Sequence, residues 1–284
     1  KGASVEMTSD KEVLRGVQIT GLDVGPDGAL YGSDWIEGWG RNENGRIWKF
    51  FTENDSESRA ELREETRQLL AEDFSSTDTE RLEQLLNHTD MRVRSKAQFE
   101  LVERGERERL QAVLKQSNVQ LARIHALWGL GQMARKNPEL GRDLIAMLGD
   151  ADAEIRAQTA KVLGDAGYAG AQSELISLLA DPSARVQFFA AQALGRTGTT
   201  DAVQPLINML AANNDDDIYL RHVGAIALAR IGDEEAVGAL ATHESEAVRI
   251  AAVVALKRMK SPMLSKFLHD DSEFVVTNVA RAIM

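Results

Sequence analysis

Residues 153–198 read AEIRAQTAKVLGDAGYAGAQSELISLLADPSARVQFFAAQALGRTG. In this stretch an apolar residue precedes both Arg156 and Gln187, and Leu follows seven residues after each of them. The same frame recurs along the chain at seven positions, here called the anchors: Arg94, Arg123, Arg156, Gln187, Arg221, Arg249 and Val276. Successive anchors lie 27 to 34 residues apart. A period of this length indicates a repeat protein.

Each period has room for two helices, a leucine-rich first helix and a second helix that carries the anchor. One apolar face per helix cannot be buried by a single pair, so stacked pairs must build a continuous core. The pattern resembles the HEAT-like repeats of phycobilisome-lyase-type and other bacterial helical-repeat proteins. We predict a mainly α fold, a right-handed HEAT-like α–α superhelix (solenoid) of about seven repeats with a small N-terminal β segment. Glycines are expected to end several helices, at Gly105, Gly131, Gly164, Gly198 and Gly232.

Composition divides the chain into three parts. Residues 1–53 hold short β-like runs, in which a Pro26–Gly28 turn separates two strands and residues 46–51 form a further one. A strand is also expected at residues 4–8. Residues 54–75 are highly charged with few apolar residues, which is typical of a solvated connecting helix. The helical repeats occupy residues 76–284, and Thr77 with Glu80 has the form of a capping box at their start.

The first part carries a second resemblance. LDVGPDGALYGSDW, residues 22–35, resembles the last blade of the β-propeller in bacterial putative membrane-bound dehydrogenases of the glucose/sorbosone type. In that family the propeller is followed by HEAT-like repeats and a cytochrome c-type haem domain. The resemblance implies that this chain is the middle piece of such a protein, with neighbouring propeller and haem domains as partners. It also implies haem or quinone in the parent protein and a periplasmic or cell-envelope location.

Charge and composition exclude several function classes. The net charge of −11 argues against binding of nucleic acid, which requires clustered cations. The absence of cysteine excludes thiolate metal sites and CxxCH haem attachment in this chain. No GxSxG, GxGxxG or Walker motif occurs, and no apolar run is long enough to insert into a membrane. We therefore expect no catalytic residues, no metal and no cofactor in this chain.

Asp90, Asp152 and Asp217 each lie four residues before an anchor Arg: Arg94, Arg156 and Arg221. At that position an Asp side chain accepts hydrogen bonds from the free N–H groups of the first helical turn. Each Arg could in addition pair with an Asp of its own or the next repeat. We therefore interpret these six residues as a structural Asp–Arg ladder along the stack.

Positions one, two and five after the anchor are expected to face outward on the concave side. Several of them are apolar or aromatic, which predicts a surface for a protein or peptide partner. The candidates are Ile124, His125, Trp128, Phe188, Phe189, His222, Ile226, Ile250 and Val254. The alternative is that these side chains fill gaps between neighbouring helices.

Three functions remain open at this stage. The preferred hypothesis is a non-catalytic protein-interaction and spacer module within a larger propeller–HEAT–cytochrome dehydrogenase. A second is that the chain is a fragment of a quinone- or haem-linked sugar dehydrogenase whose catalytic parts lie elsewhere. A third, from the repeat class alone, is a helper similar to the phycobilisome lyases.

Overall fold

The computed structural model describes residues 2–12, 15–36, 44–50 and 57–283. Most of these residues are helical, and three strands lie near the N-terminus. The chain divides into two compact units, one formed by residues 7–106 and one by residues 1–6 with 107–284. The predicted boundary between residues 53 and 54 falls outside the described residues. The two predicted repeat helices between residues 76 and 106 belong to the same compact unit as the strands.

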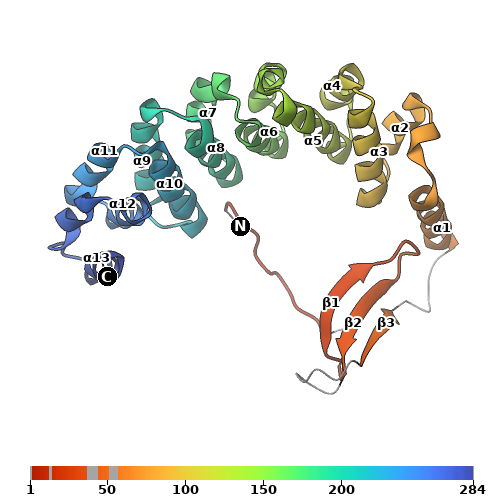
Figure 1. The fold of residues 1–284 in the computed structure, drawn as a ribbon, viewed down its shortest axis with the longest axis horizontal. Helices are drawn as coiled ribbons and strands as arrows, with labels where there is room; N and C mark the ends of the chain where they lie inside the picture. Colours follow the sequence, from red (N-terminus) through yellow and green to blue (C-terminus); the bar gives the residue numbers. More distant parts are fainter. Residues whose placement is uncertain (1, 13–14, 37–43, 51–56, 284) are drawn as a thin grey trace. The chain divides into compact units, whose positions relative to one another are not determined.

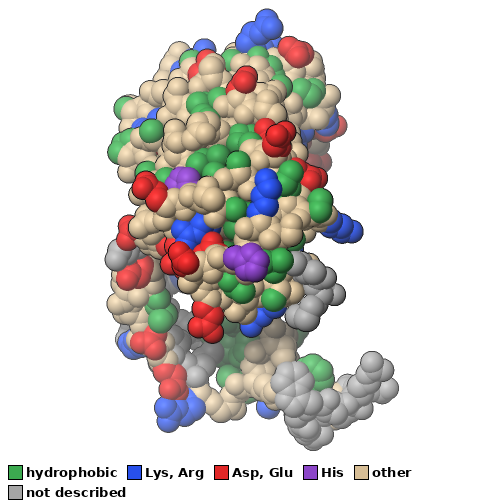
Figure 2. All heavy atoms as spheres, turned by 90° about the vertical axis from the view of Figure 1, so that its left-hand side faces the viewer, with side chains coloured by type: hydrophobic (Ala, Val, Ile, Leu, Met, Phe, Trp, Pro, Cys, Tyr) green, Lys and Arg blue, Asp and Glu red, His purple; other side chains and the backbone are tan. Residues whose placement is uncertain are grey.

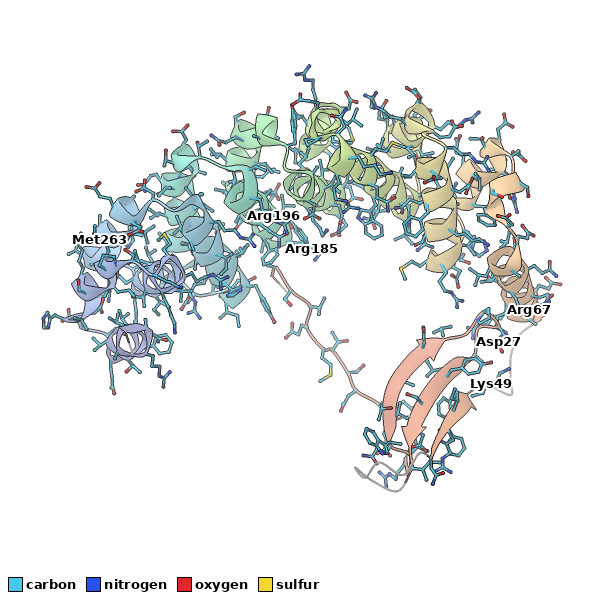
Figure 3. The ribbon with its side chains drawn as sticks, viewed as in Figure 1. Asp27, Lys49, Arg67, Arg185, Arg196 and Met263 are labelled. Atoms are coloured by element: carbon cyan, nitrogen blue, oxygen red, sulfur yellow. The ribbon has the colours of Figure 1, made fainter. Side chains whose placement is uncertain are left out.

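The first unit contains an antiparallel sheet in the order β1-β2-β3, formed by Ile19–Val24, Leu30–Trp35 and Gly45–Phe50 (Figure 1). Gly28 closes the β1–β2 turn with a φ of 73°, a conformation that favours glycine. Asp27 in this turn forms an ion pair of 2.6 Å with Lys49 of β3 (Figure 3), and this pair lowers the pKa of Asp27 to about 2. The two predicted strands on either side of the turn and the third strand are thus confirmed. No strand forms at residues 4–8.

Helices of the first unit hold the sheet. These are α1 (Glu57–Ala71), η1 (Phe74–Ser76), α2 (Thr79–Leu85) and α3 (Met91–Glu103). Arg92 of α3 donates hydrogen bonds to the carbonyl oxygens of Val24 and Gly25 at 2.7 and 2.9 Å. Lys96 of α3 donates to the carbonyl oxygens at the end of α1, so α1 is bound to the repeat helices. The N-cap of α2 is Asp78, not the predicted Thr77.

The second unit is a row of stacked helix pairs (Figure 1). In each pair the first, or A, helix is followed by a B helix that carries the anchor. The A segments are α4 (Arg107–Gln116), η2 (Pro138–Gly149), η3-α7-η4 (Ala169–Ala180), η5-α9 (Thr200–Asn213), α11-η6 (Glu234–Thr242) and η7 (Pro262–Phe267). The B helices are α5 (Gln120–Lys136), α6 (Ala153–Ala166), α8 (Ala184–Thr197), α10 (Ile218–Ile231), α12 (Glu246–Met259) and α13 (Glu273–Ile283). Several A segments are 3-10 helices, which the sequence did not predict.

The core lies between the A and B helices of successive pairs. The leucines seven residues after the anchors are buried within it, for example Leu163, Leu194 and Leu228. Consecutive B helices also pack on each other, with α6 against α8 and α8 against α10. This continuous packing is what a repeat solenoid requires, and it confirms the predicted fold class.

Two glycines that were expected to end helices lie inside them. Gly131 is within α5 and Gly164 is within α6. Both face the next B helix so closely that a Cβ atom would clash with it. Their small size therefore permits helix packing, while the α6 helix ends at Gly167, whose φ is 71°. Gly232 ends α10 in the same way, as predicted.

The surface near α11, α12 and α13 shows acidic, basic and apolar side chains interspersed (Figure 2). On this face the excess of acidic residues does not form a large patch of one sign. Among the described residues no helix is long and apolar enough to span a bilayer.

Candidate functional site

The anchor side chains fix the loops between A and B helices. Arg156 donates to the carbonyl oxygens of Asp150 and Ala151, which lie six and five residues before it, at 2.8 and 3.2 Å. Arg94 and Arg249 make the equivalent two bonds in their own repeats. These carbonyl groups at the end of the A helix have no partner within the helix, so the anchor satisfies them.

Three anchors, Arg123, Arg156 and Arg249, also connect neighbouring repeats. Arg156 forms two hydrogen bonds of 2.8 and 2.9 Å with the carboxylate of Asp181 in the next loop. Arg249 is bound in the same way to Asp270, and Arg123 to Asp150. The acidic partner thus lies six residues before the next anchor. We call this chain of contacts the anchor ladder.

This arrangement corrects the predicted ladder. Asp90, Asp152 and Asp217 are indeed the N-caps of α3, α6 and α10, as their position predicted. However, none of the three pairs with the anchor four residues after it. Their carboxylates accept from Arg92, from Gln120 and from the main-chain N–H of Ala3, respectively. The caps and the ladder are therefore separate sets of acids, because a cap oxygen is directed back along its own helix.

The ladder acids are held in the charged form. Burial favours a higher pKa for Asp150, but hydrogen bonds from Arg123 and from the N–H of Asp152 outweigh it, so the pKa is lowered. The pKa of Asp270 is lowered by the same balance of burial against bonds from Arg249 and Ser272. Opposite Asp181, the pKa of Arg156 is raised. The lowered pKa values keep Asp150 and Asp270 ionised at neutral pH.

Within residues 57–283, the inter-repeat bond seen at Arg123, Arg156 and Arg249 has no counterpart at Gln187, nor at Arg94 and Arg221. The Gln187 amide still donates to the carbonyl oxygen of Asp181, at 2.7 Å, but it makes no bond to the next loop. The acid there, Asp215, is instead paired with Arg221 of its own repeat, and its Oδ1 atom is buried without a hydrogen-bond partner among the described residues. Asn214 and Asp215 both have positive φ values, of 39° and 68°. The loop between α9 and α10 therefore differs from the other loops of the ladder.

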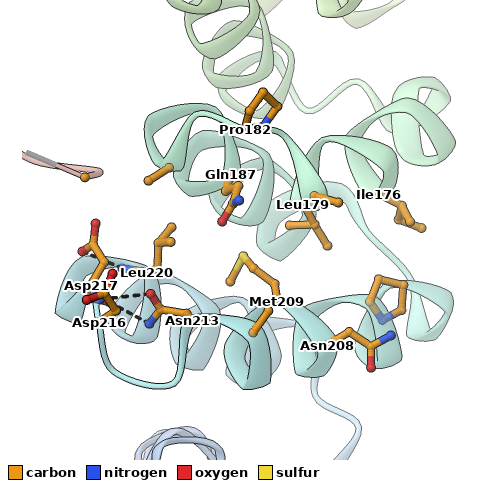
Figure 4. A pocket seen from close by; sticks show the side chains of 15 residues that line it. Ile176, Leu179, Pro182, Gln187, Asn208, Met209, Asn213, Asp216, Asp217 and Leu220 are labelled. Carbon is orange, nitrogen blue, oxygen red and sulfur yellow. Dashed lines mark hydrogen bonds between the residues drawn. The ribbon is translucent and has the colours of Figure 1, made fainter.

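A pocket of about 640 Å³ opens at Gln187, where the ladder is interrupted (Figure 4). Apolar side chains of the α8 repeat and of α9 form its floor, including Leu179, Pro182 and Met209. Its polar rim contains Gln187, Asn213, Asp216 and Asp217. The pocket also contacts Gly2, because the Ala3 N–H donates to Asp217 Oδ2 at 2.6 Å. We call this cavity the break pocket.

The predicted concave face is only partly present. Ile124, His125 and Ile250 are buried, so they pack between helices and offer no binding surface. For these three residues the alternative of packing inside the helical stack is therefore correct. The half-buried members are Trp128, Phe188, Phe189, Ile226 and Val254, and only His222 is exposed.

Contacts connect part of this set across three B helices. Trp128 lies edge-on to His125 in α5 and donates from its indole nitrogen to Gln158 of α6, at 3.0 Å. Gln158 donates to Glu154, which also accepts from Arg185 of α8 at 2.7 Å. Arg185 stacks over Phe189 at 5.1 Å, and Figure 3 shows Arg185 on the B-helix side of the row. We call these contacts the B-helix network.

The residues two positions before the anchor were not among the candidates predicted for the binding surface. Leu121 and Tyr219 occupy this position and are 47% and 48% exposed. Glu154 and Arg185 occupy the same position in α6 and α8. It shares a helix face with positions two and five after the anchor, at spacings of four and seven residues. A search of the sequence for large apolar residues at that spacing would have found Leu121 and Tyr219.

No group of three or more His, Cys, Asp or Glu able to hold a metal ion occurs in the part of the chain that the structure describes. The acids described above are occupied by caps and ion pairs. The candidate binding features are therefore the break pocket and the accessible side chains of Leu121, Trp128, Phe189 and Tyr219 on the B helices, here called the apolar stripe.

Three solved structures illustrate what the chain is similar to. One is a HEAT-like repeats protein of the archaeon Thermococcus onnurineus NA1, with 13% identity over 73% of this chain and 98% of that chain, and a TM-score of 0.40. The second is a designed armadillo repeat protein in complex with the peptide (KR)4, with 21% identity, 76% and 95% coverage and a TM-score of 0.36. The third is the complex of CpcE and CpcF of phycocyanin lyase from Nostoc sp. PCC7120, with 21% identity, 75% and 96% coverage and a TM-score of 0.34.

A comparison with curated protein sequences found no match. The profile described as HEAT repeats matches residues 141–218 and 209–284, which together make up just over half of the chain. The matched region contains α6 to α13, in which the anchor ladder and the stacked B helices have been described. The chain therefore belongs to the HEAT-repeat family.

Proposed function

We propose that this protein is a non-catalytic scaffold that binds a polypeptide partner along the B helices of its second unit. The observation that carries the proposal is the apolar and aromatic stripe on one face of these helices. Leu121 and Tyr219 are about half exposed, and Trp128 and Phe189 lie on the same face. Large apolar groups that remain accessible in a row are typical of a protein-binding surface.

The B-helix network makes this surface rigid. Trp128 and Phe189 are each held by a contact to a polar neighbour, Gln158 and Arg185. Between them Glu154 is half-buried, and bonds from Arg185 and Gln158 outweigh the effect of burial, so its pKa is lowered. A surface whose side chains are already fixed loses little conformational entropy on binding. Its mixed apolar and charged character suits a peptide with both kinds of side chain.

Site-specific photo-crosslinking tests the proposal. A photoreactive amino acid replaces Leu121 or Tyr219 in the full chain, and cells are irradiated. The matched control carries the same group at Arg142 in η2, on an A segment, where the side chain is 76% exposed. We expect a discrete crosslinked adduct from each of the two B-helix positions. The yield of this adduct should fall when Trp128→Ala is added. Equal adducts from Arg142, or no effect of Trp128→Ala, would contradict the proposal.

A second candidate places this scaffold in a larger dehydrogenase with a propeller and a cytochrome domain, in the cell envelope. The feature that favours it is the antiparallel β1-β2-β3 sheet with its Pro26–Gly28 turn, since a propeller blade is an antiparallel sheet of four strands. The family match begins at residue 141 and does not extend to this sheet. The mass of the native protein, with its haem absorbance, tests this candidate. A native protein of 31.2 kDa without haem would exclude it.

A further inference from the structure

The break pocket is not used by the proposed scaffold surface, and Gly2 lines it beside Asp217. Asp217 contributes both carboxylate oxygens here. Oδ1 caps α10 by accepting from the N–H of Tyr219 at 2.9 Å, while Oδ2 accepts from the N–H of Ala3 at 2.6 Å. Asp152, the equivalent cap of α6, has its second oxygen bound to a side chain, Gln120. Asp217 thus differs from Asp152 in holding the main chain of a distant segment.

The geometry of the bound segment is restrictive. Gly2 has a φ of 63°, and a Cβ atom at this position would stand 2.2 Å from Asp217 Oδ2. Any larger residue would therefore displace the carboxylate that holds the next N–H group. Ala3 is buried against the pocket, at 9% exposure, whereas Val5 is 93% exposed. The contact with Asp217 is thus made by Gly2 and Ala3, and the chain is exposed again at Val5.

The pocket is prepared for this contact by its own bonds. The side chain of Asn213 accepts from the Asp217 N–H at 3.0 Å and donates to the Asp217 carbonyl oxygen at 2.9 Å. These two bonds fix the loop, so Asp217 is oriented before any segment binds. Figure 4 shows Asp217 and Asn213 side by side on the rim, with Leu220 next to them. Every residue except proline carries an N–H group, so a carboxylate held in this way does not select the side chain of the residue that donates. It selects segments whose main chain can approach it closely.

We propose that the break pocket is a binding site for an extended polypeptide segment in which glycine precedes a small residue. Asp217 accepts the N–H group of the small residue, and the space beside Asp217 admits only glycine before it. In this chain Gly2 and Ala3 take these two positions beside Asp217. A partner that carries the same Gly–small sequence must compete with them, so the N-terminal segment regulates access to the pocket.

The absence of cysteine permits a direct test in the full chain. Val5→Cys, at an exposed position, is labelled with a fluorophore, and its anisotropy reports whether residues 2–6 are held. Asp217→Asn keeps an oxygen for the helix cap but replaces the second oxygen with an NH₂ group, which cannot accept from Ala3. The matched control is Asp152→Asn, which makes the same change at the cap of α6. The anisotropy should fall in Asp217→Asn and stay at the parent value in Asp152→Asn.

A second measurement tests the partner. The full chain with Ala3→Pro lacks the N–H group that Asp217 accepts, which frees the pocket. A labelled peptide with the sequence KGASVEM should bind to this variant, and the peptide with valine in place of glycine should bind about tenfold or more weakly, as expected when a charge-assisted hydrogen bond is lost. Unchanged anisotropy in Asp217→Asn would overturn the intrachain contact. Equal affinity of the two peptides, or no binding of either, would overturn the proposed recognition of Gly–small segments.

Discussion

Gly164 of α6 lies against Ala193 of α8 so closely that a Cβ atom on Gly164 would stand 2.7 Å from the Ala193 Cα atom. Gly195 of α8 has the same relationship to Ala227 of α10, at 2.8 Å. In both pairs glycine is eight residues after its anchor and alanine six residues after the next one. The spacing of the B helices is therefore set by a small residue on each side of the contact.

Substitution of Gly195 tests this spacing. Gly195→Ala is expected to destabilise the protein by about 1–3 kcal/mol, because the added methyl group would overlap the backbone of α10. Gly167→Ala is the control, since a Cβ atom there meets no neighbour and the cost of about 1 kcal/mol comes only from its positive φ. Urea unfolding measures both. A stabilising effect of Gly195→Ala, as helix propensity alone would give, would refute the close contact.

Loss of an anchor should weaken the stack. Arg156→Ala removes bonds to Asp181 and to two carbonyl groups, and we expect the free energy of unfolding to fall by about 2–3 kcal/mol. Arg142→Ala should change it by about 0.5 kcal/mol or less, since its contact to Glu139 is exposed and 3.8 Å long. Chemical denaturation of the two variants decides the point. Equal effects would mean that the anchors do not stabilise the repeats.

Repair of the ladder break is predicted to close the break pocket. Gln187→Arg places a guanidinium where Asp215 has an unpaired buried oxygen, and it should raise stability by about 1 kcal/mol. The longer side chain also fills part of the cavity, so the fluorophore at Val5→Cys should become more mobile. Thermal unfolding and anisotropy together provide the measurement. If stability rises but the anisotropy does not change, the prediction that repair of the ladder closes the break pocket is wrong.

Acid should weaken the ladder. The pKa values of Asp150 and Asp270 are lowered in the folded chain from the ordinary value of 3.8. Their pairs therefore add stability that is fully present above pH 4–5 and is lost as the pH falls through the lowered pKa values. The double variant Asp150→Asn and Asp270→Asn should show a shallower loss of stability between pH 5 and pH 3 than the parent. A slope equal to that of the parent would contradict the prediction.

The β1–β2 turn is expected to depend on Arg92. Arg92→Ala removes the donors to the carbonyl oxygens of Val24 and Gly25, so hydrogen exchange of residues 19–35 should become faster. Exchange in the second unit should not change, because Arg92 belongs to the first unit. Unaltered exchange in the sheet would show that other contacts hold it.

The repeat architecture could be predicted because it depends on periodicity alone. Seven anchors with Leu or Ile seven residues later leave no other way to bury the apolar faces, and the three caps at Asp90, Asp152 and Asp217 follow from helix chemistry. The binding features could not be predicted with the same accuracy. Ile124 and Trp128 lie on the same helix and both are apolar, but only the tertiary packing decides that the first is buried and the second half-buried.

The sequence by itself therefore determined the repeat, the three Asp helix caps and the position of the turn in the sheet, because each depends on residues close together in the chain. The tertiary structure decided which acids the anchors bind, which glycines are packing contacts, and where the break pocket lies. Those features join residues 25 or more positions apart, such as Arg156 with Asp181, Gly164 with Ala193 and Ala3 with Asp217. Their contacts depend on how far one helix pair rotates against the next, and no local pattern encodes that rotation.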